Sequence, residues 1–210
     1  TPLLPMPTFF SPAQIEHALA QAGVDLLLLE RGRIPPEMGD SAVNSEWQEC
    51  NSPNNGLRIF RRDIASAARL PDGTGKITYT SGSTGTPKGA CLSNGQLIRQ
   101  AQALADAVAI SGTRHLCLLP LCVLLENVAG VYTALLNGGS VIAPPLEELG
   151  FSGSSALDTT KLLAALNLHQ PETLILIPQL LTALVQACEQ GWQPPSTLKF
   201  IAVGGSKVAP

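Results

Sequence analysis

The stretch ETLILIPQLLTALVQACEQGWQPPSTLKFIAVGG, residues 172–205, decides the fold class. Each of its ends is an apolar run with the length of a buried strand. Between them, Leu181, Leu184 and Cys188 recur at helical spacing. Pro178 precedes this pattern, and proline is favoured in the first turn of a helix. The order strand, helix, strand predicts a βαβ unit with parallel strands.

The same alternation extends upstream to about residue 71 and indicates several such units. Strands are predicted at 76–80, 89–92, 115–121 and 140–144, and helices behind the Ser93–Gln96 capping box and at 127–136 and 159–168. Residues 1–70 read as a mostly irregular segment of the same domain, with a helix at 11–23, a strand at 24–30 and a loop at 34–56. We therefore predict a three-layer αβα sandwich with a mostly parallel sheet, in which residues 71–210 form the main α/β subdomain.

Composition excludes several classes of function. The 210 residues carry a net charge of −3, and 14% of them are charged. The sequence contains no Lys/Arg block, which argues against non-specific nucleic-acid binding. The strongest apolar run, 116–125, contains Pro120 and is too short for a membrane span. Five cysteines without a CxxC pair favour a reducing compartment, and we expect a cytoplasmic protein.

The segment TSGSTGTPKG, residues 80–89, carries the chemistry. Its glycines let the backbone approach a ligand closely, and successive N–H groups there form an anion-binding nest. The hydroxyls add neutral donors, and Lys88 adds a point charge suited to phosphate. The segment predicts a polyphosphate cradle. It is not a Walker loop, because Lys88 is followed by Gly89 and a strand, nor a GxGxxG fingerprint.

Residues 77–88 resemble the phosphate-loop signature of the adenylate-forming superfamily, which includes acyl-CoA synthetases, peptide-synthetase adenylation domains and luciferases. The resemblance implies that this chain is part of the large N-terminal domain of such an enzyme. It implies catalytic roles for Lys88 and Thr84. The implied phosphate-binding residues are Thr80, Ser81, Gly82, Ser83, Thr84, Gly85 and Lys88.

The resemblance continues more weakly downstream. Leu119-Pro120-Leu121 matches a family strand end, but Cys122 and Val123 stand where the family usually has a histidine or an aromatic residue. The family also has a Gly-Gly turn near the adenine and acyl groups, which is matched here by Gly204, Gly205 and Ser206.

The implied reaction has two steps. A carboxylate attacks the α-phosphorus of ATP to give an acyl-adenylate and pyrophosphate, and a thiol, often that of CoA, then displaces AMP. Magnesium shares the phosphate charge. The apolar run 116–125 favours a fatty or other apolar acid as substrate. The expected partners are therefore a small carboxylate, ATP and a thiol acceptor.

Family order places the other acidic and lysine motifs beyond Gly205. We therefore expect a fragment without the C-terminal domain that is inactive alone. Two alternatives stay open. One is a non-catalytic module that binds a nucleotide or an acyl-adenylate, and the other is an unrelated phosphate-binding α/β protein with a convergent loop.

Several polar residues have two interpretations. We favour Glu126 as an acid in the first turn of a helix over a polar group paired with Asn127 at the mouth of an acyl pocket. His115 alternates with Cys117 as a metal face would, but a buried strand is favoured, and no metal ligand is assigned. His17 and His169 carry no functional signal.

Overall fold

A computed structural model gives the fold of this chain. It describes residues 1–7, 9–30, 47–53, 56–64, 68–80, 87–152 and 156–206. The chain divides into two compact units, Thr1–Leu92 and Ser93–Pro210, called here the first and second units. The first unit thus extends past residue 70, because Ile77 and Tyr79 belong to its hydrophobic core.

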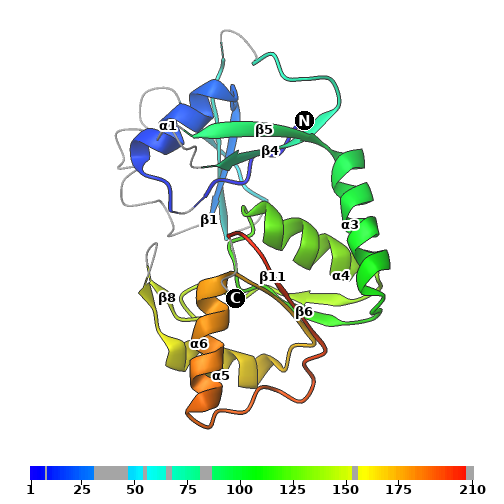
Figure 1. The fold of residues 1–210 in the computed structure, drawn as a ribbon. Helices are drawn as coiled ribbons and strands as arrows, with labels where there is room; N and C mark the ends of the chain where they lie inside the picture. Colours follow the sequence, from blue (N-terminus) through cyan, green and yellow to red (C-terminus); the bar gives the residue numbers. More distant parts are fainter. Residues whose placement is uncertain are drawn as a thin grey trace. The chain divides into compact units, whose positions relative to one another are not determined.

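The first unit contains one described helix and several short strands (Figure 1). Helix α1 (Pro12–Gln21) begins at the predicted place, because Ser11 and Gln14 form a capping box and Pro12 occupies the first turn. The buried face of α1 packs Ile15, Ala18 and Leu19 into a core that also holds Phe10, Ile77 and Tyr79.

An antiparallel sheet in the first unit was only partly predicted. Strand β1 (Leu26–Glu30) was expected, whereas β2 (Gln48–Cys50) lies inside the predicted loop 34–56 and β3 (Leu57–Arg61) follows it. The strands pair in the order β1-β3-β2. Strand β2 is exposed and polar, so it has no apolar alternation to reveal it. Its Glu49 instead pairs with Arg58 of β3 at 2.9 Å.

Two further strands, β4 (Thr74–Thr80) and β5 (Lys88–Ser93), pair with each other in a separate two-stranded sheet. Both were predicted as strands of a βαβ series. Their pairing differs from that prediction, since neither strand joins the parallel sheet. The segment 81–86 between them lies outside the described residues.

The second unit is built on a parallel sheet of four strands in the order β11-β10-β6-β7, which confirms the α/β prediction. The predicted βαβ unit 172–205 is present, since β10 and β11 pair in parallel on either side of α6. A small antiparallel pair, β8 with β9, was not predicted. The strands are β6 (Arg114–Leu116), β7 (Ser140–Ile142), β8 (Phe151–Ser152), β9 (Ala156–Leu157), β10 (Thr173–Leu176) and β11 (Phe200–Val203).

Helices cover both faces of this sheet (Figure 1). On β10, Leu174 and Leu176 share a core with α5 and α6. Thr173 points to the opposite face, where its neighbour His115 contacts the helix that follows β6. The hydroxyl of Thr133, which follows that helix, donates to the carbonyl oxygen of Ala101 in α3 at 3.5 Å. The helices are α3 (Asn94–Val108), η1 (Leu125–Tyr132), α4 (Thr133–Leu136), α5 (Thr159–His169) and α6 (Pro178–Glu189).

The segment after β6 departs from the sequence prediction in two ways. A strand was expected over 115–121, yet β6 ends at Leu116. A helix was expected over 127–136, yet the chain forms the π-helix η1 from Leu125 and becomes α-helical only at Thr133. A π-helix is rare and often marks a functional site. Among the described helices, none is long and apolar enough to cross a membrane.

Glu172 ties together the amino ends of three neighbouring strands. Its Oε2 accepts the backbone N–H of Arg114 at 2.8 Å, and its Oε1 lies 2.5 Å from the Lys199 ammonium. The Glu172 carbonyl accepts the N–H groups of Lys199 and Phe200. The hydrogen bond from Lys199, followed by that from Arg114, lowers the pKa of the Glu172 carboxyl.

We therefore expect Glu172→Gln to lower the thermal midpoint by about 2 °C at neutral pH. A depressed folded-state pKa stabilises the fold above the unfolded value of about 4.3 and loses that contribution as pH falls through the folded value. The difference from wild type should therefore shrink in acid. Thermal unfolding from pH 7 to pH 3, with the exposed Glu189→Gln as control, measures it. A difference that grows in acid would contradict the assignment.

Candidate functional site

The two ends of the predicted phosphate loop are held by paired strands. Thr80 is the last residue of β4 and Lys88 the first of β5, and both are exposed. Strand pairing brings the two strands together. The segment therefore connects two paired strands of one small sheet. The Thr80 hydroxyl lies at its start and the Lys88 ammonium at its end. The other predicted loop residues lie outside the described part of the chain: Ser81, Gly82, Ser83, Thr84 and Gly85.

The two strands that flank the loop in the sequence are anchored by Tyr79. Its ring is buried, and its hydroxyl donates to Gln21 Oε1 at 2.8 Å. Burial, with a smaller effect from Cys91, raises the pKa of Tyr79, so the hydroxyl remains a neutral donor. A Cβ atom at Gly89 would lie 3.0 Å from the Tyr79 ring. Glycine at position 89 therefore lets β5 lie close against this ring.

The predicted Gly-Gly turn lies in the second unit, directly after β11. Gly204 N–H donates to the Leu176 carbonyl at 3.0 Å, and Gly205 has a φ of +87°. A Cβ atom at Gly204 would lie 3.2 Å from Leu125 Cδ2, and one at Gly205 would lie 3.3 Å from Ile177 Cγ2. The turn thus lies at the carboxyl edge of the parallel sheet, where ligands bind in open α/β folds.

The predicted site residues are therefore divided between the two units. Thr80 and Lys88 belong to the first unit, and Gly204, Gly205 and Ser206 belong to the second. Gly205 and Ser206 are exposed, and Gly204 is half-buried.

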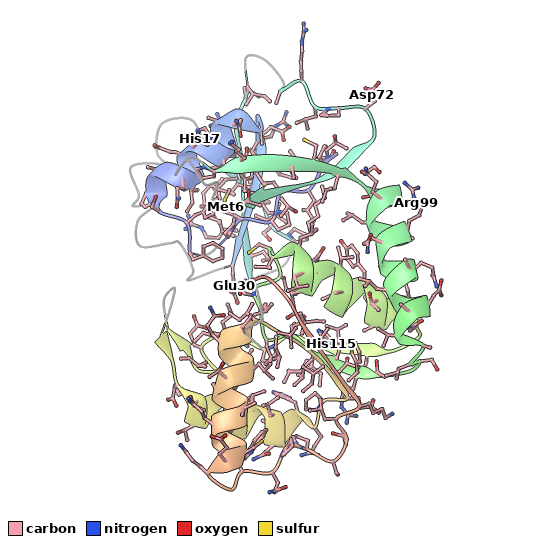
Figure 2. The ribbon with its side chains drawn as sticks, in the orientation of Figure 1. Met6, His17, Glu30, Asp72, Arg99 and His115 are labelled. Atoms are coloured by element: carbon pink, nitrogen blue, oxygen red, sulfur yellow. The ribbon has the colours of Figure 1, made fainter. Side chains whose placement is uncertain are left out.

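A buried polar network, which the sequence did not predict, lies at the carboxyl end of β6. His115 Nε2 lies 2.6 Å from Glu126 Oε1, and its Nδ1 lies 3.1 Å from Thr173 Oγ1. Glu126 Oε2 accepts the N–H groups of Leu118 at 3.2 Å and Leu119 at 2.9 Å. His115 and Glu126 are 1% and 0% exposed. His115 is labelled on its strand in Figure 2.

This network corrects the interpretation of Glu126. The residue does lie in the first turn of a helix, as favoured, but it is fully buried. A place at the mouth of a pocket is therefore wrong. The network also explains why β6 stops at Leu116, because the N–H groups of Leu118 and Leu119 bond to a carboxylate instead of a neighbouring strand.

Cys117 is the fourth polar side chain of the network. Burial first, then the charge of Glu126 and a hydrogen bond to it, raise the pKa of the Cys117 thiol to about 12. The thiol therefore remains protonated and donates to the carboxylate. It is a poor nucleophile, because the thiolate is the reactive form.

His115, Cys117 and Glu126 place one nitrogen, one sulfur and one oxygen within 4.8 Å of one another. These are ligand types that zinc accepts. Both carboxylate oxygens already have hydrogen-bond partners, however. The arrangement is thus a satisfied hydrogen-bond network, and we assign no metal ligand to it.

The chain is thus an α/β protein in which the predicted phosphate loop follows β4 in the sequence and a glycine turn lies at the carboxyl edge of a parallel sheet. The chain belongs to the AMP-binding enzyme family, whose model matches residues 2–210. This membership excludes an unrelated protein with a convergent loop.

Curated relatives of the chain include two ligases. The chain is 28% identical to 4-coumarate–CoA ligase-like 2 of Arabidopsis thaliana over 66% of its own length and 23% of that protein. It is 30% identical to a chloroplastic long-chain-fatty-acid–[acyl-carrier-protein] ligase of the same plant over 54% of its length and 16% of that protein. The chain thus spans a quarter or less of these relatives.

Two solved structures share the fold. One is a malonyl-CoA ligase in complex with methylmalonyl-CoA and AMP, with a TM-score of 0.68, 21% identity, and coverage of 100% of this chain and 42% of that one. The other is the o-succinylbenzoate CoA synthetase of Bacillus subtilis bound to its acyl-adenylate intermediate, with a TM-score of 0.65, 19% identity, and coverage of 98% and 50%.

Proposed function

We propose that the protein containing this chain activates a carboxylic acid with ATP and transfers the acyl group to a thiol such as that of CoA. A carboxylate oxygen attacks the α-phosphorus and pyrophosphate leaves. The thiol sulfur then attacks the acyl carbon and AMP leaves. The observation that carries the proposal is the loop TSGSTGTPKG, held between two paired strands in a chain of the AMP-binding family.

The loop residues have defined roles in this proposal. Preorganised donors lower the barrier where negative charge develops, which is on the departing pyrophosphate. The exposed Lys88 supplies a fixed positive charge, and Thr84 a hydroxyl, to the phosphates. Magnesium, when bound, would neutralise phosphate charge, and hydroxyl oxygens such as that of Thr80 suit it as ligands. Backbone N–H groups of the glycines complete the cradle.

An apolar acid, such as a fatty acid, is the proposed substrate class. Leu121 and Leu124 are exposed on the turn after β6, and Leu125 packs against the turn at Gly204. Hydrocarbon at this edge of the sheet favours an apolar acyl chain, since its burial is stabilising. We also propose that the protein works in the cytoplasm, where its free cysteines would stay reduced.

Carboxylate-dependent ATP–pyrophosphate exchange tests the proposal. The product of the longest reading frame containing this sequence would be assayed with short, long-chain and aromatic acids. We expect exchange with apolar acids at rates well above those with acetate. A folded protein that binds ATP but exchanges with no acid would instead be a non-catalytic binding module.

A further inference from the structure

In the buried network at β6, each polar side chain has a hydrogen-bond partner. The Glu126 carboxylate accepts from Leu118 N–H, Leu119 N–H and the Cys117 thiol. Its remaining contact, at 2.6 Å, is with His115 Nε2, which must therefore carry a proton. In the neutral form of the ring that carries this proton, His115 Nδ1 accepts from the hydroxyl of Thr173, whose oxygen lies 3.1 Å away. Such a network is stable only when every member has its partner.

The network lies directly behind the surface that the glycine turn presents. Glu126 follows Leu125, whose Cδ2 would meet a Cβ atom at Gly204 at 3.2 Å and one at Gly205 at 3.9 Å. The same carboxylate holds the backbone of Leu118 and Leu119 on the other side of the turn 120–123. One buried group thus fixes both ends of the segment that joins β6 to η1.

We propose that Glu126 is a positioning residue. Its carboxylate, oriented by His115 and Thr173, locks the segment between β6 and η1 so that Leu125 stays against the glycine turn and forms one wall of the acyl-binding site. The kinetic part rests on the proposed function, whereas the anchoring is a property of the fold. Glu126 touches no substrate in this assignment and acts through Leu125.

Two substitutions separate positioning from simple stability. Glu126→Ala removes all the acceptors, so we expect the KM for the acid in ATP–pyrophosphate exchange to rise about tenfold, with a smaller change in kcat. Glu126→Gln keeps one oxygen for the N–H groups of Leu118 and Leu119. Its amide NH₂ then faces His115 Nε2, which must become an acceptor. We expect a KM within about threefold of wild type. The exposed Glu148→Gln is the matched control.

Nitrogen-15 NMR of the His115 ring tests the hydrogen-bond network itself, whereas the change in KM relative to kcat tests the positioning role. In wild type we expect the proton on Nε2. In Glu126→Gln we expect it on Nδ1, which donates to Thr173 instead. Amide hydrogen exchange at Leu118 and Leu119 should be slow in wild type and in Glu126→Gln. It should be at least tenfold faster in Glu126→Ala.

Different results overturn different statements. An unprotonated Nε2 in wild type, or no tautomer change in Glu126→Gln, would overturn the network assignment. A folded Glu126→Ala variant with unchanged KM and unchanged amide exchange would overturn the positioning role. If the wild-type protein exchanges with no acid, the proposed function fails, while the NMR and amide-exchange results still decide whether Glu126 anchors the segment.

Discussion

Gly130→Ala is expected to destabilise the second unit by about 3 kcal/mol, because the added methyl group would overpack the core and separate the hydrogen-bonded side chains of Glu126 and His115. A Cβ atom at position 130 would lie 2.3 Å from Glu126 Oε1 and 2.4 Å from His115 Nε2. Neither group can move away, since each is buried and hydrogen-bonded on its other side. Denaturant unfolding followed by circular dichroism measures the loss as a lower midpoint.

The matched control is Gly95→Ala, also a glycine-to-alanine change within a helix. Its nearest neighbour would be the flexible end of Arg99, at 3.1 Å. Removing a glycine from helix α3 should leave stability unchanged or raise it by up to about 1 kcal/mol. Equal midpoints for Gly130→Ala and wild type would show that the contact between Gly130 and the network is loose.

Lys88→Ala is expected to slow ATP–pyrophosphate exchange by about 10²- to 10³-fold in the product of the longest reading frame. In the proposed mechanism this ammonium meets charge that develops on the departing pyrophosphate, so its loss should lower kcat. The KM for the acid should change less than threefold, because the lysine contacts phosphate and not the acyl chain. Steady-state exchange at varied acid concentration separates the two constants.

The control for the lysine is Lys161→Ala, which removes an exposed positive charge from helix α5. It leaves the phosphate loop unaltered and should exchange at the wild-type rate. If Lys88→Ala also exchanges at that rate, the role given to Lys88 is wrong.

The elements with strong local patterns were predictable from sequence. The helix predicted at 11–23 and the capping box predicted at Ser93 are both present, as α1 and as the start of α3. The apolar runs of β10 and β11 gave the correct parallel pairing. In each case the signal lies within a few neighbouring residues, so no knowledge of tertiary contacts was needed.

What the sequence could not predict depends on contacts between distant residues. Strand β2 is polar, and pairing with β3 defines it. His115 and Thr173 meet only because β6 and β10 are neighbours in the sheet. The burial of Glu126 has no periodic signal, since a charged residue in a first helical turn is ordinarily exposed. The one available signal was His115 alternating with Cys117, which placed both side chains on one face.

The phosphate-loop prediction depended on composition and spacing. The family assignment that it supported is confirmed by the match over residues 2–210. The individual roles of Thr80, Lys88 and the glycine turn at Gly204 stay predictions, and the exchange measurements above address them.

The position of Glu172 has a consequence for how the sequence of this protein can evolve. Its hydrogen bonds join β6, β10 and β11 at their amino ends, whereas the turn at Gly204 and the side chain of Leu125 lie at the opposite edge. The contacts of Glu172 and the proposed acid-binding positions therefore lie at opposite edges of the sheet. Under the proposed function, substitutions at the carboxyl edge would alter the acid preference while the hydrogen bonds of Glu172 at the amino edge still hold the three strands in register.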